Sequence, residues 1–158
     1  MTDNILKADH FIGTAIIYLK ATEAIKINEN EPEDERYLIY LPICTLYCFA
    51  IECLLKGLNN LENADYKNPK IHNLKKLFNS LPSKTQEVIQ CYYKKYGDDN
   101  LIETLTKSSN QFIESRYFFA DVMEDGGKKT INIPNEKLKN ISESIIIYIQ
   151  KAHPRGAN

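Results

Sequence analysis

Three polar residues stand where the sequence around them is apolar or aromatic, and their types suit acid–base or phosphate chemistry. Glu52 is the only formal charge between Leu38 and Leu55. His72 precedes a short predicted helix, and Arg116 lies among aromatic residues at a predicted helix end. An imidazole can transfer protons near neutral pH. A guanidinium binds phosphate or carboxylate through its planar fork. These three residues are therefore the candidates for a functional site.

Each candidate also has a purely structural interpretation. Lys56 follows Glu52 by four residues, which is the favourable order for a Glu–Lys pair on a helix. This pair could simply stabilise the end of a core helix, or Glu52 could anchor a polar cluster with residues from elsewhere. His72 could fix a loop by bonding a carboxylate, with Asn73 as the N-cap of the next helix. Arg116 could form a buried ion pair instead of binding phosphate.

A basic segment is the fourth feature. Residues 67–95 contain seven lysines and one acid, Glu87, although the whole chain has a net charge of −1. Tyrosines interleaved with lysines can hold single-stranded nucleic acid by base stacking and phosphate contacts. The alternative is a solvated lysine face whose tyrosines pack inward. The nucleic-acid candidates are Lys75, Lys76, Tyr92, Tyr93, Lys94 and Lys95.

Other kinds of site are not expected. Cys44 and Cys48 are one helical turn apart, but no second Cys or His pair has ligand spacing, so we expect no metal. No Gly-rich phosphate loop or serine nucleophile motif is present, and no cofactor is expected. Cys44, Cys48, Cys53 and Cys91 are interpreted as reduced core thiols of a cytoplasmic protein.

Helical periodicity dominates the chain and predicts an all-α, up-and-down bundle of four to six helices in one domain, residues 1–158. Pro42 marks a kink or the first turn of the second helix. Ser83 and Gln86 have the spacing of a capping box, and Gly97 stops that helix. The predicted helices are 4–28, 35–60, 73–81, 83–96, 99–117 and 135–152.

Three segments break this periodicity. We expect an acidic solvated loop at 29–35, a loop or small hairpin at 121–134 and a frayed tail at 153–158. The longest uncharged stretch, 38–51, is shorter than the roughly 20 residues that span a bilayer, so no membrane segment is expected. The polar, acidic N-terminus predicts no signal peptide and hence a cytoplasmic protein.

Three motifs together resemble the HEPN superfamily. Residues 46–58, with Glu52 and Lys56, resemble its A-x-E-x-x-L-K-x-L helix. His72-Asn73-Leu74 with Leu77 resembles the H-[DN]-L-x-x-L segment of one bacterial branch, and Arg116-Tyr117 resembles its R-Y pair. Order and spacing agree across residues 41–119. The resemblance implies a four-to-five-helix bundle, commonly homodimeric, from toxin–antitoxin or phage-defence systems, often beside a nucleotidyltransferase-type partner.

Many HEPN proteins are metal-independent endoribonucleases with Arg and His four to six residues apart on one helix. No His follows Arg36 or Arg116 at that distance here. We therefore expect a binding protein for a partner protein, a nucleotide or RNA. An accessory subunit whose partner supplies the chemistry is a further interpretation. The enzymatic alternative is a divergent endoribonuclease using His72 and Arg116. The polar cluster around these two residues would comprise Glu52, Lys56, Asn73 and Tyr117.

Overall fold

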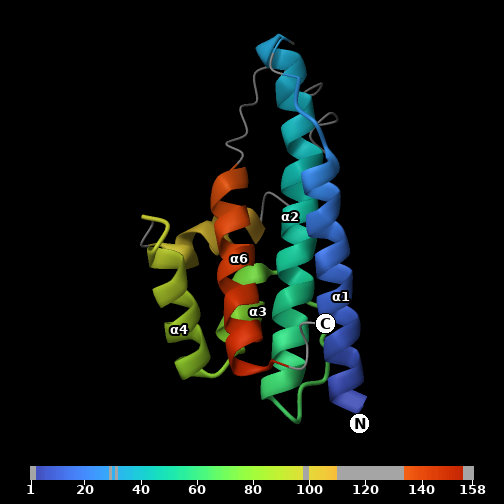
Figure 1. Cartoon of the computed structure of the whole chain (residues 1–158). Coiled ribbons are helices and arrows are strands. Elements are labelled where there is room, and N and C mark those ends of the chain that lie inside the picture. The colour runs from blue at the N-terminus through green and yellow to red at the C-terminus, as the bar shows by residue number, and fades with distance from the viewer. Residues whose placement is uncertain (1–2, 29, 31, 98–99, 110–133, 155–158) are drawn as a thin grey trace.

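The helical prediction is confirmed over the part of the chain that the structure describes. This computed structural model describes residues 3–28, 30, 32–97, 100–109 and 134–154. Residues 101–109 are also helical. Of the predicted loop or hairpin at 121–134, all but Pro134 lies outside the described residues, as do residues 155–158 of the tail. The other helices are α1 (Asp3–Ala24), α2 (Glu33–Glu62), α3 (Leu74–Asn79), α4 (Ser83–Lys94) and α6 (Asn135–Ala152) (Figure 1).

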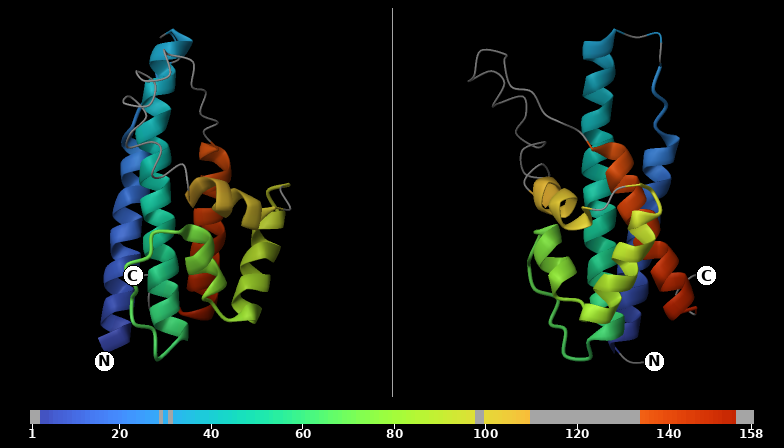
Figure 2. Two further views of the ribbon diagram at one scale, coloured as in Figure 1. Left: turned by 180° about the vertical axis from the view of Figure 1, so that it is seen from behind. Right: turned by 90° about the vertical axis from the view of Figure 1, so that its left-hand side faces the viewer.

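α2 is the central element because it is apolar on most sides. It packs against α1 on one side and against α3 and α6 on the other, while α4 packs on α6 (Figures 1 and 2). The α1–α2 contact is close: a Cβ at Gly57 would lie 2.8 Å from Cγ1 of Ile12 and 3.2 Å from the carbonyl oxygen of Ala8. Small residues at this crossing let the two backbones approach. The fully buried side chains of α2 include Ile51, Leu54, Leu55 and Leu58.

The acidic loop is shorter than predicted. α2 begins at Glu33, directly after Pro32, so residues 33–35 belong to its first turn. A proline suits a helix start, because it needs no amide partner there. Pro42 lies inside α2, so the alternative that it occupies the first turn is wrong.

Other helix ends also differ from the prediction. α1 ends at Ala24, four residues early, and α3 spans six residues only. The predicted capping box of α4 is wrong: Ser83 is already helical, no side chain caps that end, and the Gln86 amide donates to the Leu81 carbonyl at 2.7 Å. Gly97 has the positive φ (+80°) expected of a helix stop, but α4 ends at Lys94, two residues before the predicted end at Tyr96. The bounds of α6 match the prediction.

One stretch of α2 is long and apolar enough to cross a membrane, judged by length and composition. It comprises Ile39–Glu62 and is longer than the uncharged run recognised in the sequence. However, 61% of its apolar part is buried against the rest of the protein. This burial is the pattern of a core helix and is compatible with a soluble protein.

Candidate functional site

The candidate site is built around Glu52, a charged residue on the buried helix α2. Glu52 is only 7% exposed. A buried carboxylate destabilises a fold unless charges or hydrogen bonds compensate it. The Lys56 ammonium donates to Glu52 Oε1 at 2.8 Å, and the two side chains are 11% and 10% exposed. The predicted Glu52–Lys56 pair is therefore confirmed, and it lies almost out of water.

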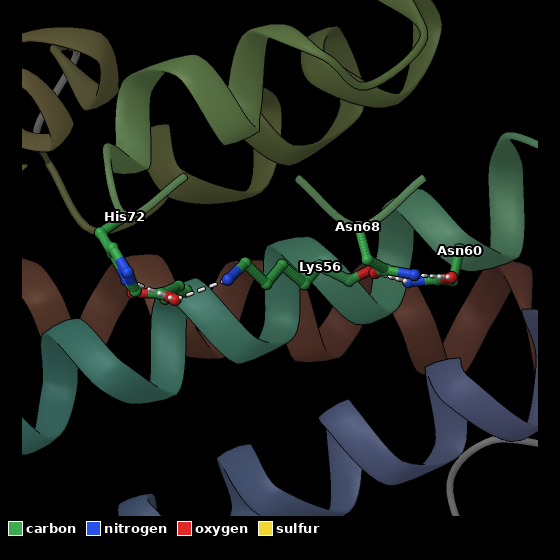
Figure 3. A network of polar contacts seen from close by, with 5 residues as sticks. Lys56, Asn60, Asn68 and His72 are labelled. Carbon is green, nitrogen blue, oxygen red and sulfur yellow. Dashed lines mark hydrogen bonds and ion pairs between the residues drawn. The ribbon is translucent and has the colours of Figure 1, made fainter. Parts of the chain in front are cut away.

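His72 is the second partner of this carboxylate. Its Nδ1 lies 3.1 Å from both Oε1 and Oε2 of Glu52, and Figure 3 shows His72 and Lys56 meeting the same carboxylate. Because the carboxylate accepts, Nδ1 carries the proton, and in the neutral ring the basic lone pair is on Nε2. The side chain is 61% exposed. We call Glu52, Lys56 and His72 the Glu52 cluster. In this cluster the carboxylate of Glu52 holds the exposed imidazole of His72 in one tautomer.

The loop after α2 is tied down so that His72 reaches Glu52. Asn68 has a φ of +47°, a conformation that asparagine tolerates better than most residues. The Asn68 and Asn60 amides exchange two hydrogen bonds of 2.6 and 2.9 Å (Figure 3). Asn60 also donates to the Lys56 carbonyl at 2.8 Å. This asparagine pair anchors the loop to α2 one turn beyond the Glu52 cluster.

The loop continues into α3, whose first turn has its amides satisfied by side chains. The Lys76 amide donates to the Asn73 side chain at 2.9 Å, which confirms Asn73 as the N-cap. The Leu74 amide donates to Ser109 Oγ at 2.9 Å, from the helical segment 101–109. Asn73, predicted as a member of the polar cluster, therefore fixes the backbone next to His72 instead of contacting Glu52.

The charge of Glu52 contributes to the raised pKa values of two neighbouring side chains, and no sequence pattern indicated either of them. Burial, with a contribution from the Glu52 charge, raises the pKa of the Cys53 thiol to about 11, while the Lys56 charge acts to lower it. Burial, with a contribution from Glu52, also raises the pKa of the Tyr66 phenol. The Tyr66 hydroxyl is buried and has no hydrogen-bond partner among the described residues. Both thiol and phenol therefore stay protonated beside the carboxylate at neutral pH.

Arg116 and Tyr117 lie outside the described residues. Their approach to the Glu52 cluster, and the role of Arg116 as a phosphate ligand, stay predictions.

The basic segment presents its lysines but not all of its tyrosines. Tyr93 is fully buried, which leaves its ring no face for a base, so this nucleic-acid candidate is corrected. Tyr92 is half-buried, and the ammonium groups of Lys95 and Lys151 lie 5.2 and 4.9 Å from its ring centroid. Lys75 is half-buried. The exposed lysines of the segment are Lys67, Lys70, Lys76, Lys84, Lys94 and Lys95.

A second polar cluster, which the sequence analysis missed, joins three helices at the C-terminal end of α2. Tyr148 donates to Glu62 Oε1 at 2.5 Å, His153 Nε2 lies 3.0 Å from the same oxygen, and Thr85 donates to Oε2. Burial acts to raise the pKa of Glu62, but these hydrogen bonds outweigh it and the pKa is lowered. His153, predicted to be frayed, is thus fixed to α2.

The cysteines correct one further prediction. All four are free; Cys44 and Cys48 are buried and Cys53 is half-buried, but Cys91 is exposed and is not a core thiol. Among the described residues, no three His, Cys, Asp or Glu side chains gather to hold a metal ion.

Comparison of the chain with known protein families, characterised proteins and solved structures finds no match. The Glu52 cluster offers an exposed, oriented imidazole that can accept or donate a proton, or bond a phosphate oxygen when it is protonated.

Proposed function

We propose that this protein is a HEPN-like helical bundle protein that binds RNA through the surface around His72. The observation that carries the proposal is the exposed His72 ring, which the buried Glu52 carboxylate holds in place. A fixed donor or acceptor on the surface costs little conformational entropy when a ligand binds. The HEPN resemblance further implies a bacterial toxin–antitoxin or phage-defence setting, a homodimer and a nucleotidyltransferase-type partner.

The charge around His72 supports a polyanionic ligand. Exposed lysines precede and follow His72 in the chain, at Lys70 and Lys76. Residues 67–95 carry seven lysines and one acid, so phosphate is attracted to this segment although the whole chain is nearly neutral. Lys56 does not add to this attraction, because Glu52 neutralises it. The binding energy is therefore expected from the surface lysines and the orientation from His72.

Fluorescence anisotropy with a labelled single-stranded RNA tests the proposal. We expect binding that weakens as salt rises, because phosphate contacts release counterions. Lys70→Ala and Lys76→Ala should each lower the magnitude of the slope of log K against log salt by roughly 0.7. The matched control is Lys26→Ala, an exposed lysine beyond the end of α1. Absence of binding at low salt, or an equal effect of Lys26→Ala, would refute RNA binding at this surface.

A second candidate function is a divergent, metal-independent endoribonuclease using His72 and Arg116. The observation that favours it is the carboxylate–imidazole pair, in which Glu52 fixes the ring so that its basic nitrogen is Nε2. An imidazole held in this way can act as the general base for 2′-hydroxyl attack, with Arg116 as phosphate ligand.

Incubation with total RNA in EDTA separates the two functions. Cleavage by the wild type, but not by His72→Ala or Arg116→Ala, would establish the enzyme. Glu52→Gln should then lower the rate without abolishing it, because it keeps the imidazole but weakens its orientation. Intact RNA in every reaction, with all proteins folded and RNA still bound, would reject the enzyme and leave the binding function standing.

A further inference from the structure

Two lysines from different helices meet at one aromatic ring where α4 packs beside α6 (Figure 1). The ammonium groups of Lys95 and Lys151 lie 5.2 and 4.9 Å from the centroid of the Tyr92 ring. Lys95 is the C-cap of α4, and Lys151 lies in the last turn of α6. Both lysines are exposed, whereas Tyr92 is half-buried. The ring therefore holds two positive charges that the sequence did not connect.

These two charges have no counter-charge of their own. Neither ammonium group has an ion-pair partner among the described residues. The two nitrogens are at most about 10 Å apart, since each lies about 5 Å from the same ring centroid, and this is within the Debye length at 0.1 M salt. Part of their mutual repulsion therefore remains in solution, and an anion bound between them would remove it.

The carboxylates of the neighbouring helices are already compensated by other groups. Glu143 of α6 accepts a hydrogen bond from Tyr96 at 2.8 Å and lies 3.8 Å from the Lys139 ammonium. Glu62 of α2 accepts its hydrogen bonds within the second polar cluster described above. The two lysines at the ring therefore contribute their charge to the surface without neutralisation by these acids.

We propose that Tyr92, Lys95 and Lys151, which we call the Tyr92 site, bind a phosphomonoester group. Such a group carries about −1.5 to −2 charges at pH 7 and three strong acceptor oxygens, which suit two ammonium donors. A phosphodiester within an RNA chain carries only one charge and is matched less well. The cation–π contacts also restrain both lysine side chains, so less conformational entropy is lost when the anion binds.

The phosphomonoester can belong to the phosphorylated end of an RNA or to a free phosphorylated molecule. Both present the same chemistry to the two ammonium groups. The proposal does not rest on RNA binding around His72, because Lys70 and Lys76 supply the charge there and belong to a different part of the surface.

An NMR titration with inorganic phosphate, at pH 7.5 and constant ionic strength, tests the Tyr92 site. The ε-methylene signals of Lys95 and Lys151 should shift together with one dissociation constant. The control is Lys84, an exposed lysine of α4 that contacts no aromatic ring among the described residues. Its signals should respond only at phosphate concentrations roughly tenfold higher or more, because a single ammonium forms about one charge-assisted hydrogen bond fewer. Equal responses of the three lysines would overturn the proposal.

Substitutions separate a site organised by the ring from simple attraction to positive charge. Lys151→Gln should weaken phosphate binding at Lys95 roughly tenfold, whereas Lys84→Gln should leave it unchanged. Tyr92→Leu keeps both charges but removes the ring, and should weaken binding roughly threefold. Tyr92→Phe keeps the ring and should bind like the wild type, with circular dichroism as the folding check. Undiminished binding by Lys151→Gln or by folded Tyr92→Leu would overturn the proposal.

Fluorescence anisotropy with one RNA in 5′-phosphorylated and 5′-hydroxyl forms identifies the source of the phosphate. Tighter binding of the phosphorylated form, with the difference lost in Lys151→Gln, would assign the site to an RNA end. Equal binding of the two forms, with phosphate bound in the titration, would assign it to a free phosphorylated molecule. If neither RNA binds, the function proposed above fails, while the phosphate titration still decides whether the Tyr92 site exists.

Discussion

The Glu52–Lys56 pair gives the most direct test of how this fold tolerates a charge in its central helix. Glu52→Gln keeps the shape and one hydrogen-bond acceptor but leaves the Lys56 ammonium, 11% exposed, without its counter-charge. Removing one partner of a buried pair costs about 3–5 kcal/mol. Lys56 can shift its ammonium towards water, and glutamine retains an acceptor, so we expect a loss of about 2 kcal/mol in the free energy of unfolding.

Urea denaturation followed by circular dichroism measures this loss. At about 2 kcal/mol per molar urea, the midpoint should fall by about 1 M. The control is Glu103→Gln, which breaks the exposed Lys107–Glu103 pair of the same i, i+4 spacing, with side chains 69% and 50% exposed. Exposed helix pairs contribute less than about 0.5 kcal/mol, so the control should shift little. Equal shifts in the two variants would refute the argument from burial.

Three further predictions concern other parts of the fold. The pKa of Glu62 is lowered in the fold, so its contribution to stability is present above its ordinary pKa and is lost as the pH falls through the lowered value. Glu62→Gln should therefore be less stable than the wild type at pH 6, and this difference, measured by urea denaturation, should shrink as the pH is lowered to 3. Iodoacetamide at pH 8 should modify the exposed Cys91 quickly, but hardly modify Cys53, whose pKa is about 11. Gly57→Ala should destabilise the fold by about 1–3 kcal/mol in thermal melts, because its Cβ would lie 2.8 Å from an α1 side chain.

Each of these predictions has an outcome that contradicts it. A gap for Glu62→Gln that widens on acidification would mean that its pKa is raised in the fold. Modification of Cys53 at the rate of Cys91 would mean that its thiol is accessible and ionised. A neutral or stabilising Gly57→Ala would show that α1 can move away. The control for that variant is Gly13→Ala, because nothing lies within 4 Å of the new Cβ. Helix propensity predicts that this control raises the free energy of unfolding by up to about 1 kcal/mol.

The sequence by itself determined the helical class, because apolar residues at helical spacing can bury one face only as helices. It also determined the Glu52–Lys56 pair and the Asn73 cap, since both depend on residues three or four positions apart. The bounds of α6 were predictable for the same reason: its apolar stripe runs unbroken between Pro134 and His153. Local geometry suffices for such features.

Tertiary structure decided what depends on residues far apart in the chain. Glu62 and His153 are separated by 91 positions, so no local pattern revealed that His153 is held, and it was predicted to fray. Tyr92 and Tyr93 are the same residue type in adjacent positions, and the sequence did not distinguish them. The packing of α4 nevertheless buries only Tyr93 completely. The bond from His72 to Glu52 likewise required the loop after α2 to fold back on that helix. Burial and long-range pairing arise only when the helices pack, because packing determines which face of each helix is removed from water.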